Sequence, residues 1–181
     1  MKVLVPLADG FEEIEFCTIV DILRRCEIDV VTVGLKAGPI KGSHMIKIIP
    51  DVYFDEINPD DFDAIAIPGG YPGFVNLRED ERVLKIIREM DKKKKYIAAI
   101  CGAPSVLIRA GIMEGRKATV HPAGISEFSS DQYVDERVVV DGKLITSKAP
   151  GTAMEFAVKL VEILAGRGRA NKVKEEVFAK F

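Results

Sequence analysis

The sequence predicts an α/β protein in which helices cover both faces of a mostly parallel β-sheet. Short β-rich runs alternate with longer segments whose apolar residues recur at helical spacing, and this alternation is typical of such a sheet. A chain of 181 residues has the usual size of one compact domain, and no repeat or linker marks a boundary within it. We therefore expect residues 1–181 to form a single domain.

The first half of the chain alternates strands with helices in order. A strand at Val3–Leu7 is followed, after Asp9-Gly10, by a helix whose apolar stripe includes Ile19, Ile22 and Leu23. The remaining predicted elements in this half are a strand at 29–33, a shorter extended piece at 45–49, a buried strand at 64–67 and a helix at 80–93.

In the second half, a strand at 96–100 leads into a helix at 103–110, which ends at Gly111. A strand at 117–120 then delivers His121. Asp141-Gly142 lies between two β-rich runs, 138–140 and 143–146, and predicts an antiparallel hairpin insertion with a type I′ turn. An amphipathic helix starting at 150–152 and ending at Gly166, and a basic helix at 170–180, complete the chain.

Composition excludes several classes of partner. With 26 basic and 28 acidic residues, the chain offers no electrostatic case for nucleic acid or an anionic membrane. The run Lys92–Lys95 fits a helix C-terminus, where positive charge is favourable. No segment has the length of a membrane span, and the first residues lack a basic region followed by a long apolar stretch, so we expect no secretory leader. We expect a soluble cytoplasmic protein.

The three cysteines, Cys17, Cys26 and Cys101, match neither a disulfide framework nor a zinc site, which favours a reducing compartment. The sequence has no CxxC or HExxH pattern and no glycine-rich nucleotide motif. We therefore expect no metal and no cofactor. The individual roles of Cys17 and Cys26 are not determined by the sequence.

Cys101 is the strongest candidate for chemistry because an apolar strand ends at it and a helix begins shortly after. A thiol at such an elbow lies near a helix N-terminus, which favours the thiolate, and its small neighbours admit a substrate. The alternative is a small apolar residue at the end of a core strand. Both interpretations are open from the residues alone.

Other candidates lie at the carboxyl ends of the predicted strands, where open α/β sheets bind ligands. Glu15 lies on the inward face of the first helix and can act as a buried acid and base; alternatively, Glu12, Glu13 and Glu15 are solvated acids of a helix start. His121 can hold a proton near neutral pH or serve as a structural hydrogen-bonded group, and His44, in a polar loop, is the weaker of the two histidines. Three glycines are the last candidates: Gly69, Gly70 and Gly102. Their main-chain amides can stabilise an oxyanion, or they can be plain turn glycines.

Together these segments resemble the ThiJ/PfpI superfamily, and within it the DJ-one, or parkinsonism-associated deglycase, branch. The resemblance covers nearly the whole chain in order. The matching segments are Asp9–Glu15, Ile67–Gly70, Ala98–Pro104, Val120–Pro122 and Thr146–Thr152. It implies a flavodoxin-like three-layer sandwich, similar to class I glutamine amidotransferases, and a homodimer. It also implies Cys101 as nucleophile, Glu15 as the protonated carboxyl beside it and His121 as the nearby histidine.

The resemblance implies a cofactor-independent glyoxalase or deglycase acting on methylglyoxal-type oxoaldehydes or their early adducts. The alternative is a redox-sensing stress or chaperone protein that acts through oxidation of Cys101. A third hypothesis is an intracellular cysteine peptidase or amidase. It is disfavoured because PfpI-type peptidases carry a histidine directly after the cysteine, where this chain has Gly102. No additional cysteine lies at 42–49, where some animal members carry them, so Cys101 would be the principal redox thiol.

Overall fold

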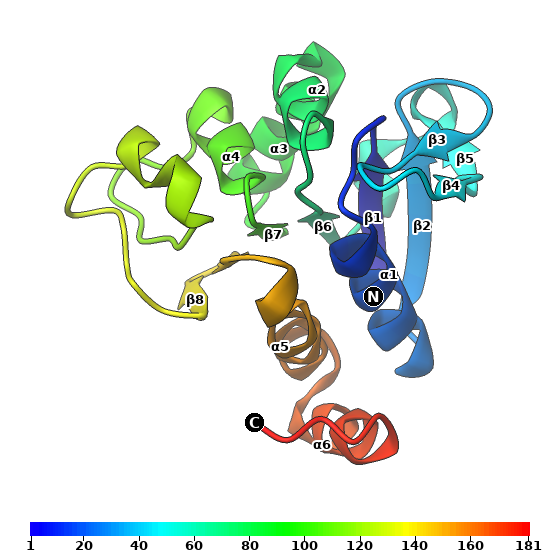
Figure 1. Cartoon of the computed structure of the whole chain (residues 1–181), viewed down its shortest axis with the longest axis vertical. Coiled ribbons are helices and arrows are strands. Elements are labelled where there is room, and N and C mark those ends of the chain that lie inside the picture. Colours follow the sequence, from blue (N-terminus) through cyan, green and yellow to red (C-terminus); the bar gives the residue numbers. More distant parts are fainter.

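A seven-stranded sheet lies between two layers of helices in the computed structural model, which describes all 181 residues (Figure 1). The strand order is β5-β2-β1-β6-β7-β9-β8, and all neighbours are parallel except β8 and β9. The strands are β1 (Lys2–Leu7), β2 (Asp29–Gly34), β5 (Val52–Tyr53), β6 (Ala64–Ile67), β7 (Tyr96–Ile100), β8 (Val138–Asp141) and β9 (Leu144–Ser147). The α/β sandwich expected from the sequence is confirmed.

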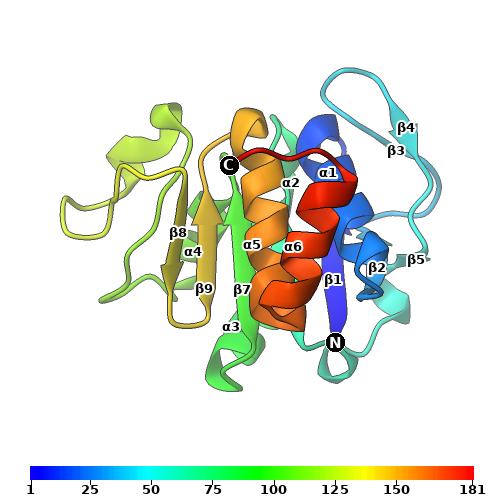
Figure 2. The same cartoon turned by 90° about the horizontal axis from the view of Figure 1, so that it is seen from below.

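Six α-helices form the outer layers. On one face, α1, α5 and α6 pack in front of the strands, and α2, α3 and α4 cover the other (Figures 1 and 2). Their bounds are α1 (Glu13–Arg25), α2 (Gly73–Glu79), α3 (Glu81–Lys92), α4 (Pro104–Ala110), α5 (Ala153–Ala165) and α6 (Arg167–Glu176). Four short 3-10 turns are η1 (Phe54–Glu56), η2 (Pro59–Asp61), η3 (Pro122–Glu127) and η4 (Pro150–Thr152).

The core divides into two halves because successive strand residues point to opposite faces of the sheet. In β1, Val3 and Val5 pack with the α1 and α5 side, where Phe156 is fully buried, whereas Leu4 packs with the α2–α4 side. Both faces of β1 are therefore buried. This agrees with its unbroken apolar sequence.

Several element boundaries match the sequence pattern. Asp80 caps α3 by accepting a hydrogen bond from the backbone N–H of Arg82, and Gly111 ends α4 with φ +78°. The lysine run follows the end of α3 as expected, and Lys95 Nζ donates to the Phe62 carbonyl at 2.5 Å.

The predicted strand at 117–120 is wrong. Its only β-pairing is an isolated bridge between Ala118 and Tyr133. The N–H of Lys117 donates to the Asp141 carboxylate, and that of Thr119 donates to Thr146 Oγ1. Side chains thus take the donors that a strand would give to a neighbouring ladder.

Three further predictions need correction. The 45–49 piece is reduced to β4 (Lys47–Ile48), which pairs with β3 (Ile40–Lys41) in a small separate sheet. The β8–β9 hairpin is present, but its two-residue loop is Gly142-Lys143 instead of Asp141-Gly142, and only Gly142 has positive φ, so the turn is not type I′. The last helix spans 167–176 rather than 170–180, because Gly166 both ends α5 and starts α6.

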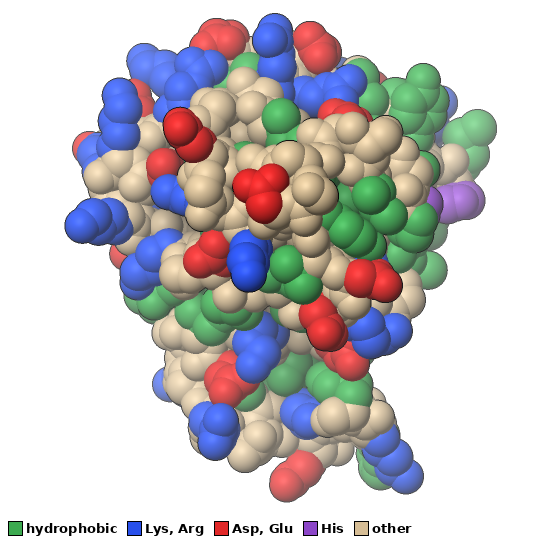
Figure 3. All heavy atoms as spheres, turned by 90° about the vertical axis from the view of Figure 1, so that its left-hand side faces the viewer, with side chains coloured by type: hydrophobic (Ala, Val, Ile, Leu, Met, Phe, Trp, Pro, Cys, Tyr) green, Lys and Arg blue, Asp and Glu red, His purple; other side chains and the backbone are tan.

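No helix combines the length and apolar character needed to cross a bilayer. Lys and Arg side chains alternate with Asp and Glu over the face shown in Figure 3, and no region of a single sign dominates it. This distribution agrees with the nearly balanced charge of the chain.

Candidate active site

Cys101 occupies a sharp elbow between β7 and α4. Its φ of +63° lies in the left-handed region, which costs a residue with a side chain about 1–2 kcal/mol. Two backbone hydrogen bonds hold it there: its N–H donates to the Ser147 carbonyl at 2.9 Å, and its carbonyl accepts from the N–H of His121 at 2.9 Å. A strained elbow of this kind projects a nucleophile beyond the strand ends.

The loops that follow β1 and β6 are joined beside this elbow. The Glu12 N–H donates to the Gly69 carbonyl at 2.9 Å, and the Gly73 N–H donates to the Gly10 carbonyl at 3.1 Å. Gly70 has φ +93°, and a Cβ there would lie 2.2 Å from the backbone nitrogen of Glu12. Only glycine allows the two loops to approach this closely.

Glu15 is fully buried and lies beside the Cys101 thiol. Its Oε2 accepts a hydrogen bond from the Gly69 N–H at 2.7 Å, whereas Oε1 is buried without any donor. Burial raises the pKa of Glu15 to about 8, although the hydrogen bonds from Gly69 and Cys101 oppose that rise. A pKa of about 8 means that Glu15 is mainly protonated at pH 7.

The structure corrects the expectation that the elbow alone favours a thiolate. Burial, followed by the negative charge of an ionised Glu15, raises the pKa of Cys101 to about 12. The backbone N–H groups of Gly102 and Gly70 act in the opposite direction. When Glu15 is protonated, its charge no longer opposes ionisation of Cys101, whereas burial still raises the pKa of the thiol.

A cavity of about 330 Å³ opens over the sulfur. His121 lines it, and its Nδ1 accepts a hydrogen bond from the Ala123 N–H at 3.2 Å, which leaves the proton of a neutral ring on Nε2. The lining residues are Gly70, Tyr71, Phe74, Cys101, Gly102, Ser105, His121, Ala123, Gly124 and Glu127. Gly102 is close-packed, since a Cβ there would lie 2.6 Å from the Phe74 ring.

The structure brings Cys101, Glu15 and His121 together, with the amides of Gly70 and Gly102 beside the sulfur. The N–H of Gly69 is not available to a substrate, because it is bound to Glu15.

The first-turn acids are not solvated, contrary to the alternative weighed from the sequence. Glu12, Glu13 and Glu15 are 7%, 5% and 0% exposed. His44 lies outside the cavity, where its Nδ1 pairs with Glu13 Oε2 at 2.9 Å.

Six cavity residues were missed by sequence reasoning: Tyr71, Phe74, Ser105, Ala123, Gly124 and Glu127. Tyr71 and Phe74 flank a turn that includes the cis Tyr71-Pro72 bond, and their rings lie 6.4 Å apart. The only sequence signal was the glycine- and proline-rich stretch after β6. Nothing local to Glu127 connects it with Cys101.

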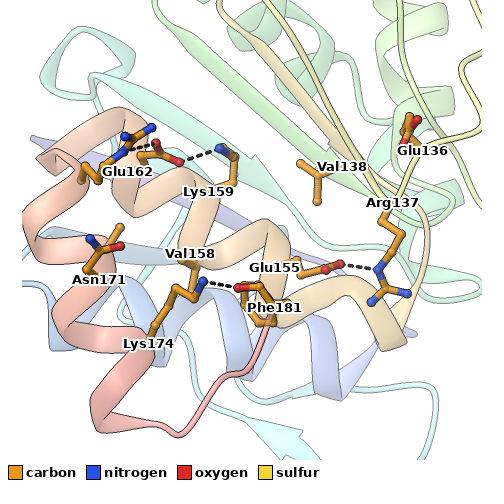
Figure 4. A pocket seen from close by; sticks show the side chains of 12 residues that line it. Glu136, Arg137, Val138, Glu155, Val158, Lys159, Glu162, Asn171, Lys174 and Phe181 are labelled. Atoms are coloured by element: carbon orange, nitrogen blue, oxygen red, sulfur yellow. Dashed lines mark hydrogen bonds and ion pairs between the residues drawn. The ribbon is translucent and has the colours of Figure 1, made fainter.

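A larger cavity of about 490 Å³ lies between α5, α6 and β8 (Figure 4). Its charged side chains are mostly paired with one another: Arg137 with Glu155, and Lys159 with Glu162 at 2.5 Å. No cysteine or histidine lines it. Of these two cavities, only the one at Cys101 is lined by a cysteine or a histidine.

The ligand atoms of Glu12, Glu13 and His44 lie within 4.8 Å of one another, a spacing that could hold a metal ion. These groups already have partners. Glu12 Oε2 accepts from the Glu15 N–H at 2.8 Å, and Glu13 Oε1 accepts from the His44 N–H at 2.6 Å. The group therefore has a structural function: it fixes the start of α1 and the β3–β4 hairpin.

Comparison with known proteins gives the same family throughout. The model of the DJ-1/PfpI family matches residues 1–163. The chain is 39% identical to the protein dj-1beta of Drosophila melanogaster, over 98% of this chain and 97% of that one. It is 35% identical to a protein of Pyrococcus abyssi named a deglycase, over 91% and 99% of the two chains.

Solved structures agree with the sequence comparison. The oxidized DJ-1 of Toxoplasma gondii has a TM-score of 0.96 and 34% identity, over 99% of each chain. The DJ-1 homologs A and B of Arabidopsis thaliana are longer, and this chain spans 44% and 38% of their lengths. On the family match, the identities and the shared fold, this chain belongs to the DJ-1/PfpI family.

Proposed function

We propose that the protein is a cysteine-dependent, cofactor-independent glyoxalase or deglycase acting on methylglyoxal-type oxoaldehydes or their early adducts. One observation carries the proposal: a fully buried carboxyl whose pKa is raised to about 8 lies beside a strained cysteine in a cavity. A nucleophile with an adjacent proton donor and acceptor is what carbonyl addition followed by proton transfer requires.

The reaction begins when the Cys101 thiolate adds to the aldehyde carbon, forming a carbon–sulfur bond. The amides of Gly70 and Gly102 hold the oxyanion, which takes a proton from Glu15 to give a hemithioacetal. The Glu15 carboxylate then removes the carbon-bound proton, giving an enediolate. The hydroxyl proton moves to the neighbouring oxygen, and Glu15 returns its proton to the neighbouring carbon, giving a 2-hydroxy thioester. Water releases the 2-hydroxy acid and the thiol.

His121 assists these proton transfers, since it lines the same cavity and its Nδ1 is already occupied by the Ala123 N–H. No oxidant or reductant is consumed, because the oxidation of the aldehyde carbon is balanced by reduction of its neighbour. For an adduct, the Cys101 thiolate displaces the amine or thiol from the aldehyde-derived carbon, a departing thiolate taking its proton from Glu15, and this gives the same hemithioacetal. The deglycase name of the Pyrococcus relative supports this substrate class.

The test is release of lactate from methylglyoxal by the reduced protein, without glutathione or added metal. Cys101→Ser should abolish release, and Cys17→Ser, which alters an exposed cysteine on α1, should not. Undetectable turnover by the unmodified protein, or undiminished turnover by Cys101→Ser, would refute the proposal.

A second candidate is redox sensing by Cys101. The neutral carboxyl of Glu15 can donate a hydrogen bond to a sulfinate, and the Toxoplasma relative has been solved in an oxidized form. Mass spectrometry after mild peroxide separates the two roles. Selective addition of two oxygens at Cys101, in a protein without turnover, would favour sensing.

The unpaired cysteines fit a reducing compartment, and we propose a cytoplasmic location for the protein.

We also propose that the protein is a homodimer through the start of α1 and the β3–β4 hairpin. Four large apolar side chains are exposed there: Ile14 (57%), Met45 (69%), Ile46 (53%) and Ile49 (75%). The Glu13–His44 pair joins these two segments into one surface. Light scattering on Ile49→Asp tests the proposal, since a charge in a buried apolar interface should yield monomers.

A further inference from the structure

The mouth of the Cys101 cavity carries one acidic side chain, Glu127, which is the only Asp or Glu among the lining residues. It belongs to η3, and its side chain is 43% exposed. Its only ion-pair partner, Arg78, lies 3.4 Å away, at the long limit of a hydrogen bond. Glu127 therefore keeps most of its capacity to accept a hydrogen bond from a ligand.

Arg78 does not neutralise this mouth. Its guanidinium lies between two carboxylates, Glu127 at 3.4 Å and Glu79 at 3.4 Å, and 5.9 Å from the centre of the Phe74 ring. Arg78 itself does not line the cavity. Arg78 is thus shared between two acids, and of the three charged groups only Glu127 lines the cavity.

Tyr71 acts in the same direction, because it lines the wall of the cavity and the face of such a ring attracts cations. The Phe74 ring, which also lines the wall, already has the Arg78 guanidinium 5.9 Å from its centre. The cavity of about 330 Å³ also falls in the range of roughly 300–1,000 Å³ typical of sites for ligands much larger than a three-carbon oxoaldehyde. There is room beyond the sulfur for a second group on the substrate.

We propose that Glu127 is a specificity-determining residue that selects carbonyl compounds bearing a cationic nitrogen over neutral or anionic ones. Within the proposed function, which this inference extends, the preferred substrates are amine adducts of oxoaldehydes. In such an adduct, the reacting carbon lies at Cys101 and the protonated nitrogen lies between the Glu127 carboxylate and the aromatic wall. Free 2-oxo acids are disfavoured because their carboxylate meets Glu127.

The charge selection can be measured without turnover, through the rate at which Cys101 reacts with charged thiol reagents. A methanethiosulfonate forms a disulfide with the thiolate and releases methanesulfinate. We compare the cationic aminoethyl reagent with the anionic sulfonatoethyl reagent, and follow the peptide containing Cys101 by mass spectrometry so that Cys17 and Cys26 do not contribute. Glu127→Gln should lower the cation-to-anion rate ratio about ten-fold at low salt.

Two further variants sharpen the test. Glu127→Lys should invert the preference, and the matched control Glu175→Gln, which removes an exposed acid on α6 on the other side of the sheet, should leave the ratio unchanged. A ratio that changes less than about two-fold in Glu127→Gln, or equally in Glu175→Gln, overturns the assignment.

A kinetic measurement tests whether selection of cationic substrates by Glu127 also operates in the proposed reaction. For Glu127→Gln, the KM of the methylglyoxal adduct of Nα-acetyl-lysine should rise about five-fold more than that of free methylglyoxal, with a smaller change in kcat. An equal rise for both substrates contradicts the inference. If the unmodified protein turns over neither substrate, the proposed function fails, while the thiol-reagent rates still decide whether Glu127 filters charge.

Discussion

The neutral state of Glu15 predicts an unusual dependence of stability on pH. The pKa of Glu15 is raised from 4.5 to about 8 on folding, chiefly by burial. At about 1.36 kcal/mol for each pH unit, this difference corresponds to about 5 kcal/mol as an upper limit, because part of the proton loss is shared with Cys101.

The sign follows from the protons bound in each state. Between pH 4.5 and about 8 the folded protein keeps the Glu15 proton and the unfolded chain does not, so stability falls as pH rises through this window. Below pH 4.5 the contribution is fully present, and above about pH 8 it is lost. Glu15→Gln, which is neutral at every pH, should lack this slope.

The assay is urea denaturation of the reduced protein and of Glu15→Gln at intervals from pH 4.5 to 9. The stability of the variant relative to the unmodified protein should increase by up to about 5 kcal/mol over this range.

Glu13→Gln is a matched control on the same helical turn. Burial tends to raise the pKa of Glu13, but its hydrogen bonds, chiefly that with His44, hold it below its usual range. The stabilisation that comes from this lowered pKa is lost as pH falls. Ionisation of Glu13 therefore makes stability rise with pH, which is opposite in sign to the effect of Glu15. Parallel curves for Glu15→Gln and the unmodified protein would refute a neutral Glu15.

Three further predictions concern packing, backbone and charge. Phe156→Ala, at a fully buried position on α5, should lower the free energy of unfolding by about 3–5 kcal/mol in urea titrations, and a loss below about 1 kcal/mol would contradict the core described above. Gly70→Ala should cost at least about 2 kcal/mol, because its Cβ would meet the backbone of Glu12 at a positive φ; thermal unfolding that matches the unmodified protein would show that the loops can separate. The pKa of His44 should lie above 6.5 in an NMR titration, because it hydrogen-bonds Glu13, and it should fall towards 6.5 in Glu13→Gln; no change would mean that the pair does not form in solution.

Strong periodicity and turn residues were sufficient to predict most of the sheet. β1, β6 and β7 are buried on both faces, so their sequences are apolar throughout and their positions are clear. Short elements carry too little pattern: β5 consists of Val52 and Tyr53 alone, and α2 begins at a glycine without a capping side chain. Such elements form because neighbouring segments pack against them, which no local window shows.

The site residues also fall into those that the sequence could predict and those that it could not. Cys101 and Glu15 could be found because one ends an apolar strand and the other lies on the inward face of a helix. The 117–120 segment looks like a strand but gives its N–H groups to side chains and a loop, and it still places His121 beside Cys101 through one backbone hydrogen bond. Glu127 reaches the cavity only through the folded path of η3.

The state of the Glu15 carboxyl is the most direct test of the account, since both the reaction and its redox alternative depend on it. The measurement is a carbon-13 NMR titration of the glutamate side-chain carboxyls, with the Glu15 signal assigned by its loss in Glu15→Gln. We predict a protonated carboxyl at pH 7 and a pKa of about 8. An ionised Glu15 at pH 7, titrating near 4.5, would contradict the account.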